Sequence, residues 1–145
     1  MLKYITPIIL LLLLAGCAHQ PATTFKPLRG LALSTDAPFT TVEFLDTEIL
    51  LYQGETLMGS IQRAPVPEPD QTAIEALKEG FMVSQGGSYK PVLLETPSDT
   101  YAYVVHTPNF STIFVATQQH PTHWAVISVR KEYYTPIASS LAYTR

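Results

Sequence analysis

Cys17 is the only cysteine in the chain, and its neighbours give a thiol a chemical reason to stand there. The chain begins with Met1-Leu2-Lys3, continues through an unbroken apolar run over 8–14, and reads Leu14-Ala15-Gly16 directly before the cysteine. A weakly basic start, an apolar middle and small residues at a cut site are the parts of an export signal. The sequence therefore predicts that residues 1–16 are a signal peptide.

The tetrapeptide Leu14-Ala15-Gly16-Cys17 resembles the lipobox of bacterial lipoproteins. In that family the signal is cut before the cysteine, and fatty acyl chains such as palmitate are attached to its thiol and its new amino group. Each buried methylene contributes about 0.8 kcal/mol to membrane binding, so several chains make a lasting anchor. Because Ala18 rather than Asp follows the cysteine, the resemblance implies an outer-membrane protein that faces the periplasm.

Two other interpretations of this segment are possible. Residues 4–16 could form a membrane span, but a span needs about 20 apolar residues. Cys17 could instead be a buried core residue, although nothing in a core requires Leu-Ala-Gly before it. With Cys17 acylated, no cysteine is left for a disulfide in the mature chain.

Two histidines, His120 and His123, stand three residues apart and could share a metal ion if a third ligand converged on them. The sequence marks no carboxylate as that ligand, and the helical zinc-protease motif is missing. We therefore expect a turn that happens to hold two histidines, and no metal.

Pairs of carboxylates can hydrolyse glycosidic bonds, one acting as acid and the other as base or nucleophile. Such spacing is nevertheless common on any acidic surface. The chain also lacks the Gly-X-Ser-X-Gly motif of serine hydrolases and a glycine-rich phosphate loop. The sequence predicts no catalytic residue and no cofactor. The carboxylates whose spacing would allow such a pair are Glu43, Asp46, Glu48, Glu68 and Asp70.

Charge is unevenly distributed along the mature chain. Without Lys3 it carries eight Lys or Arg and twelve Asp or Glu, and eleven of the acids lie between Asp36 and Asp99. This distribution argues against nucleic acid as a partner, because phosphate contacts need clustered basic residues. It favours a cationic partner, which an acidic face would attract. The alternative is a solvated surface that keeps the protein soluble.

The pattern predicts a mainly β (α+β) fold, an antiparallel meander sheet with one short helix near residues 70–80. We expect a lipidated tether over 17–27 and a single β-rich domain over 28–145, a length that can bury one core. Branched and aromatic residues favour strands, and glycine or proline separates them. The expected strands cover residues 28–33, 41–45, 48–53, 57–63, 81–84, 88–95, 101–107, 110–117 and 123–130, with a last strand or extended tail over 133–145.

Local signals refine this expectation. Asp70 is expected to cap the helix and Gly80 to end it. Gln85-Gly86-Gly87 is expected to be a hairpin turn between two strands. Pro91 suggests that its strand lies at a sheet edge. Tyr101, Tyr103 and Val105 should share one face of their strand.

Three loops are the candidates for binding a partner, because a rigid loop loses little entropy on docking. The first is the proline-rich acidic loop 65–70, the second is 84–89, and the third is 118–123 beside Trp124. The candidate contact residues in these loops are Glu68, Asp70, Gln85, Tyr89, Gln118 and His120.

As a whole, the chain is similar to the immunity lipoproteins that protect bacteria from type VI secreted cell-wall hydrolases. Size, lipobox, acidity and the lack of catalytic motifs carry this resemblance, over residues 17–145. It implies an inhibitor that blocks the peptidoglycan-binding groove of a muramidase-type effector. Two alternatives stay open: an accessory structural lipoprotein of an envelope secretion or assembly complex, which would pair through an edge strand over 89–95, and an enzyme acting on peptidoglycan.

Overall fold

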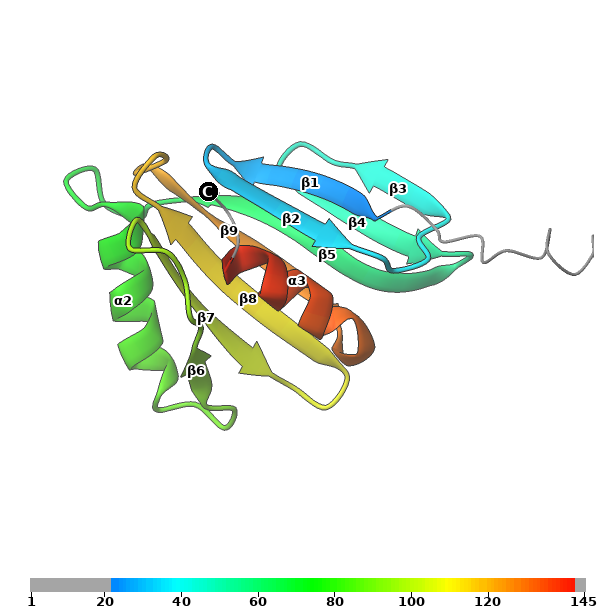
Figure 1. Ribbon diagram of the computed structural model, residues 1–145. Helices are drawn as coiled ribbons and strands as arrows, with labels where there is room; N and C mark the ends of the chain where they lie inside the picture. Colours follow the sequence, from blue (N-terminus) through cyan, green and yellow to red (C-terminus); the bar gives the residue numbers. More distant parts are fainter. Residues whose placement is uncertain (1–21, 143–145) are drawn as a thin grey trace, which may run out of the picture.

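The computed structural model of the protein describes residues 22–142, which form one large sheet, a small hairpin and two α-helices (Figure 1). The large sheet has the strand order β3-β4-β5-β9-β8-β7-β6, and every neighbouring pair is antiparallel. Its strands are β3 (Thr41–Phe44), β4 (Glu48–Gln53), β5 (Thr56–Pro65), β6 (Pro91–Leu93), β7 (Thr100–His106), β8 (Phe110–Thr117) and β9 (His123–Arg130). The mainly β, antiparallel fold expected from the sequence is confirmed.

The remaining elements cover the two faces of this sheet. The hairpin consists of β1 (Thr23–Leu28) and β2 (Leu31–Thr35). The helix α2 (Ala73–Ser84) joins β5 to β6, and the chain ends in the short 3₁₀ helix η1 (Lys131–Tyr133) and α3 (Tyr134–Ala142). The hairpin and α3 pack on one face, whereas α2 packs on the other over β7, β8 and β9.

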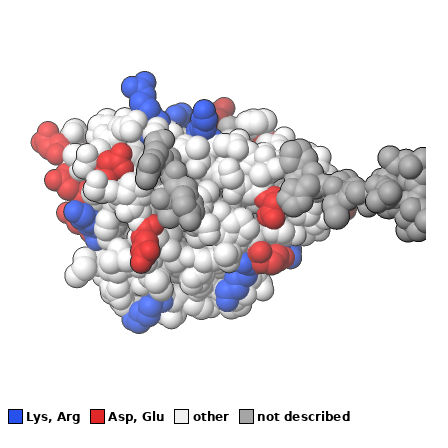
Figure 2. Space-filling model, viewed as in Figure 1, with Lys and Arg blue, Asp and Glu red and all other residues white. Residues whose placement is uncertain are grey.

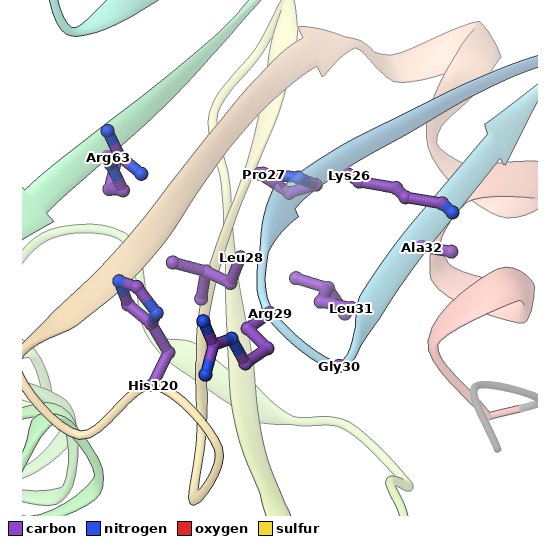
Figure 3. A pocket seen from close by; sticks show the side chains of 9 residues that line it. All are labelled: Lys26, Pro27, Leu28, Arg29, Gly30, Leu31, Ala32, Arg63 and His120. Carbon is purple, nitrogen blue, oxygen red and sulfur yellow. The ribbon is translucent and has the colours of Figure 1, made fainter.

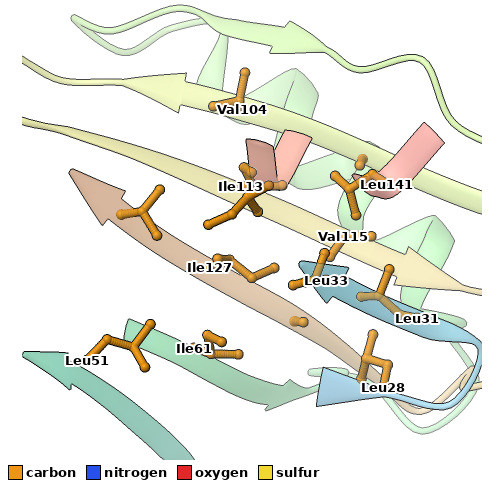
Figure 4. Packing of buried hydrophobic residues seen from close by; sticks show 14 residues of the cluster. Leu28, Leu31, Leu33, Leu51, Ile61, Val104, Ile113, Val115, Ile127 and Leu141 are labelled. Carbon is orange, nitrogen blue, oxygen red and sulfur yellow. The ribbon is translucent and has the colours of Figure 1, made fainter. Parts of the chain in front are cut away.

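The main core lies between the large sheet and the hairpin. Val104, Ile113 and Ile127 are aligned across β7, β8 and β9 and are completely buried. The leucines of the hairpin and of α3 close over them (Figure 4). On the opposite face, Tyr103 stacks on Phe114 with ring centroids 4.8 Å apart, and α2 covers this pair. Period-two alternation along β7 thus serves both cores.

Several sequence expectations are confirmed. The strands expected over 48–53, 110–117 and 123–130 coincide with β4, β8 and β9. Tyr101, Tyr103 and Val105 share the face that α2 covers. Pro91 starts β6, which is an edge strand, as a residue without an amide donor should.

The N-terminal part of the domain differs from expectation. Residues 23–27, expected in the tether, belong to β1. There the Phe25 ring packs edge-to-face on the Phe39 ring, with the two centroids 6.4 Å apart. The single strand expected over 28–33 is wrong, because the chain reverses at Arg29-Gly30. Gly30 has φ +78°, a left-handed conformation that costs a side-chain-bearing residue about 1 kcal/mol. Leu28 and Leu31 consequently face the core from two strands.

The helix α2 begins and ends later than the expected helix near residues 70–80. Its cap is Thr72 rather than Asp70: the Glu75 amide donates to the Thr72 hydroxyl, and the Thr72 amide donates to the Glu75 carboxylate. Gly80 does not end the helix but lies inside it. A Cβ added at this position would lie 3.2 Å from the Tyr103 hydroxyl, so glycine leaves room for that group. The helix therefore takes up 81–84, and the hairpin expected around Gln85-Gly86-Gly87 does not form.

The C-terminal segment forms a helix instead of the expected strand or tail. Ile137 and Leu141 are four residues apart, so they lie on one helical face, and both are buried in the main core. Pro136 is tolerated because it lies in the first turn of α3, where no intrahelical amide donor is needed.

Candidate binding surfaces

The structure brings two of the three predicted loops together. The Val66 amide donates to the Thr122 carbonyl at 3.0 Å, and the Ala73 amide donates to the Pro121 carbonyl at 2.6 Å. The acidic loop before α2 and the β8–β9 loop are therefore one structural unit. The loop after α2 lies at the other end of that helix (Figure 1). The first unit holds Glu68, Asp70, Gln118 and His120, and the separate loop holds Gln85 and Tyr89. Cys17 lies outside the described residues.

A second contact joins the β8–β9 loop to the tip of the β1–β2 hairpin. The Thr117 hydroxyl donates to the Arg29 carbonyl at 3.1 Å, although 88 residues separate them in the chain. The Gln119 side chain packs over Gly30, where an added Cβ would lie 2.7 Å from it. This contact holds the hairpin tip in place and forms the rim of a pocket.

This pocket has a volume of about 610 Å³ and lies between the hairpin tip, β5 and the β8–β9 loop. Three cationic residues line it: Lys26 and Arg29 from the hairpin and Arg63 from β5. Figure 3 shows the His120 ring between Arg63 and Arg29. Pro27 and Leu28 contribute an apolar part of the wall. We call this site the basic pocket.

The electrostatics of the basic pocket act on His120. Burial lowers the pKa of this imidazole, and the nearby His123, Arg63 and Arg29 lower it further. The two histidine rings lie close, with centroids 5.4 Å apart. Within residues 22–142, no third His, Cys, Asp or Glu joins them in a group that could hold a metal ion.

A smaller hollow of about 260 Å³ adjoins the basic pocket. It shares Lys26 and Arg63 with that pocket but adds two carboxylates, Asp46 and Glu48, which were among the candidates for hydrolytic chemistry. The two hollows therefore differ in charge, because no Asp or Glu is among the described residues that line the basic pocket.

An exposed apolar surface lies at the opposite end of α2. Met82 is 69% exposed and Val83 79% exposed on the last turn of the helix, and Tyr89 and Leu93 follow at about half exposure. Leu93 aligns with Tyr103, so it lies on the α2 side of the sheet edge. We call these four residues the apolar patch. Large apolar side chains exposed in one region of the fold are candidates for an interaction surface.

The loop inside the apolar patch is held by local bonds. The Gly86 and Gly87 amides donate to the Val83 and Ser84 carbonyls, and the Lys90 ammonium donates to the Gln85 carbonyl. Such a loop loses little entropy on docking. Two predicted contact residues, Gln85 and Tyr89, thus lie in or beside the patch. Met82 and Val83 were missed, although two bulky apolar residues on the solvent side of a helix are visible in the sequence once its boundaries are known.

Charged side chains are unevenly distributed on the surface. Figure 2 shows several acidic side chains on the α2 side of the molecule and basic ones at the upper edge near the tip of the β1–β2 hairpin, while both signs also occur elsewhere in the view. Two of the exposed acids, Glu75 and Glu79, belong to α2 itself. The apolar patch thus borders an acidic helix, whereas the basic pocket lies beneath the basic hairpin.

Comparison of the chain with protein-family models, with curated proteins and with solved structures finds no match. None of the helices in the described part of the chain has the length and apolar character that crossing a bilayer requires.

Proposed function

We propose that this protein is a non-enzymatic, lipid-anchored protein of the bacterial envelope that works by binding another protein. The observation that carries the proposal is the apolar patch, where Met82 and Val83 stand in solvent at 69% and 79% exposure. Fully burying one such side chain stabilises a complex by about 1.5–3 kcal/mol, so covering this surface with a partner is favourable. The lipobox at Leu14-Ala15-Gly16-Cys17 supports the anchor.

The surroundings of the patch indicate the chemistry of that partner. Glu79 is exposed on the same helix, one turn before Val83, whereas Glu75, Glu68 and Asp70 lie toward the other end of the helix. A partner with an apolar contact area and a basic rim would match both properties, since opposite charges steer association and exclude wrong partners.

The fold also limits how far the domain can stand from the membrane. With the anchor at Cys17 and β1 starting at Thr23, six Cα–Cα steps separate them and can span at most about 20 Å. The domain is therefore held close to the bilayer, which restricts its partners to proteins that reach the membrane surface. A long tether over 17–27 would not impose this restriction.

In its most specific form, the proposal is that the partner is a secreted cell-wall hydrolase of the muramidase type. The protein would inhibit it by covering its peptidoglycan-binding groove, at the outer membrane facing the periplasm. The resemblance to immunity lipoproteins supports this choice, and the acidic surroundings of the patch suit a groove with basic residues at its rim.

The test uses the mature chain, residues 17–145, carrying Cys17→Ser, which removes the acylation site and leaves the described domain unchanged. We expect it to form a soluble one-to-one complex with the cell-wall hydrolase encoded beside it, measured by calorimetry, and to stop that enzyme from releasing peptidoglycan fragments. Absence of a complex at micromolar concentrations would refute the inhibitor proposal. Turnover of purified peptidoglycan by this chain itself would refute the non-enzymatic one.

The second candidate is an accessory structural lipoprotein of an envelope secretion or assembly complex. The specific observation in its favour is β6, a three-residue edge strand whose outer side has no strand partner among the described residues. Such edges can accept a strand from another protein. In that case the acylated protein should co-purify with membrane-embedded subunits instead of a hydrolase.

A further inference from the structure

The basic pocket concentrates positive charge in an acidic protein. The chain has a formal net charge of −3, yet Lys26, Arg29 and Arg63 line one hollow together. They come from β1, the hairpin turn and β5, so the fold itself brings them together. Like charges repel, and clustering them costs free energy unless an anion is present for part of the time.

The cations of the pocket are also not used to hold the fold together. No hydrogen bond or ion pair joins the Lys26, Arg29 or Arg63 side chain to another described residue. By contrast, Arg130 donates through Nε to the Leu57 carbonyl at 3.2 Å. The donors of the pocket are thus available to a ligand, and the rim that positions Arg29 is fixed by the hydrogen bond from Thr117 to its carbonyl.

We propose that the basic pocket binds the phosphate group of a small organic phosphate, with Arg29 and Arg63 as its cationic donors and His120 as an additional hydrogen-bonding group. Guanidinium forks pair with phosphate oxygens in two parallel hydrogen bonds. Lys26 lines the pocket, but its ammonium points away from these three groups (Figure 3). This proposal is independent of the proposed partner protein, because it concerns a different surface.

Charge and shape both favour an organic phosphate over a simple carboxylate. A phosphate monoester carries about −1.5 to −2 charges near pH 7, which the two guanidinium groups match better than they match a single negative charge. A volume of about 610 Å³ is far larger than one ion needs and is typical of sites for small organic ligands. The organic part of the ligand would lie against Pro27, because Leu28 and Leu31 are buried in the main core.

The phosphate could belong to a soluble ester or to a lipid headgroup. Thr23 starts β1 and Arg29 directly follows its last residue, so the pocket is about 20 Å from the end of the strand nearest Cys17 in the sequence. The pocket end therefore lies away from the point of attachment, which favours a soluble ester. The experiment separates the two sources.

The test is a titration of the Cys17→Ser chain with glycerol phosphate, followed by the amide and imidazole resonances in NMR. We expect saturable shifts confined to the hairpin tip and the β8–β9 loop, and a rise in the pKa of His120, because a bound anion opposes the lowering caused by Arg29 and Arg63. The His123 ring lies 5.4 Å from the His120 ring and is coupled to it, so the resonances of both rings are followed in the same titration.

Two charge-removing variants, Arg29→Gln and Arg63→Gln, should each weaken glycerol phosphate binding at least tenfold. Lys131→Gln removes an exposed charge outside the pocket and should change it less than twofold. Equal losses for all three variants, or shifts spread over every surface cation, would overturn the proposal. Glycerol at the same concentration should cause no shift, and shifts equal to those of the phosphate would likewise overturn it.

Vesicles of phosphatidylglycerol provide the second arm. If the headgroup is the ligand, the protein should bind these vesicles, glycerol phosphate should compete, and Arg29→Gln should abolish binding. If a soluble ester is the ligand, glycerol phosphate should bind alone and the vesicles should not. Both results support a phosphate site, whereas binding of neither probe would refute it.

Discussion

The apolar patch and the basic pocket lie at opposite ends of α2 and are built in opposite ways. The patch is exposed, apolar and formed by residues 82–93, which are neighbours in the chain. The pocket is concave, basic and formed by segments around residues 28, 63 and 120, which only the fold brings together. The first surface suits a protein partner and the second a small anion. One domain of this size can thus carry two recognition chemistries that share no residue.

The largest expected effect follows from breaking the patch alone. The double variant Met82→Lys/Val83→Lys should lower affinity for the partner by at least about 30-fold, since central interface residues are worth about 2 kcal/mol or more. Lysine suits the C-terminal end of a helix, and both positions are exposed, so stability should change by no more than about 0.5 kcal/mol. Calorimetry and thermal unfolding measure the two quantities.

The matched control is Phe44→Lys. Phe44 is 75% exposed on β3, at the opposite edge of the sheet, and should leave affinity for the partner unchanged. Equal weakening by Phe44→Lys would show that the partner does not distinguish the patch from exposed apolar surface elsewhere. Phosphate binding should be unchanged in the Met82→Lys/Val83→Lys variant, because neither residue lines the basic pocket.

The rim of the pocket can be tested through its glycine. Gly30→Ala should lower the free energy of unfolding by about 1–2 kcal/mol, because it adds both a strained backbone and a contact with Gln119. Gly54→Ala shares the positive φ, at +59°, but meets nothing within 4 Å, so it should lower the free energy of unfolding by only about 1 kcal/mol. Chemical denaturation measures both. Only Gly30→Ala should also weaken phosphate binding, and an equal effect of Gly54→Ala on binding would contradict the role of the rim.

The cap of α2 connects the acidic loop to the helix that carries the patch. Thr72→Ala should lower the free energy of unfolding by about 1 kcal/mol, because the Glu75 amide loses its acceptor. Asp70→Ala removes the residue that the sequence suggested as the cap and should change stability by no more than about 0.5 kcal/mol. Chemical denaturation of the two variants decides between them, and the opposite ranking would contradict the observed cap.

The smallest effect concerns the pH dependence of the same cap. Hydrogen bonds from the Thr72 amide and hydroxyl lower the pKa of Glu75, so the ionised carboxylate is the form that stabilises the fold. Its contribution is complete above the unfolded pKa of about 4.3 and is lost as pH falls through the lower folded pKa. The stability difference between the wild type and Glu75→Gln should therefore shrink below pH 4. A difference that stays constant down to pH 2 would contradict this linkage.

The strands were the most predictable part of this fold. Branched and aromatic residues between glycine- or proline-containing turns located β4, β8 and β9 to the residue. The helices were harder. Thr72 and Glu75 form a capping box that the sequence displays, but Asp70, two residues earlier, is also a preferred type of cap residue. The spacing of Ile137 and Leu141 fits a helix, yet the surrounding aromatic and branched residues favour a strand locally.

The two surfaces differ in the same respect. Gln85 and Tyr89 were predicted as contacts because they belong to one short glycine-containing loop, which a sequence displays directly. The basic pocket could not be predicted without the tertiary structure. Arg29 lies near His120 because of a hairpin turn and the hydrogen bond from the Thr117 hydroxyl to the Arg29 carbonyl, and no local sequence pattern indicates either. Of its four polar residues only His120 was a candidate from the sequence, and it was chosen for protein contact rather than for an anion.

Site-specific photocrosslinking in the native envelope tests the central proposal most directly. A benzophenone side chain at position 83 should capture a secreted cell-wall hydrolase, identified by mass spectrometry, whereas the same group at position 44 should not. Capture of that hydrolase from position 44 alone, or of a membrane-embedded complex subunit from position 83, would contradict an inhibitor that docks through the apolar patch.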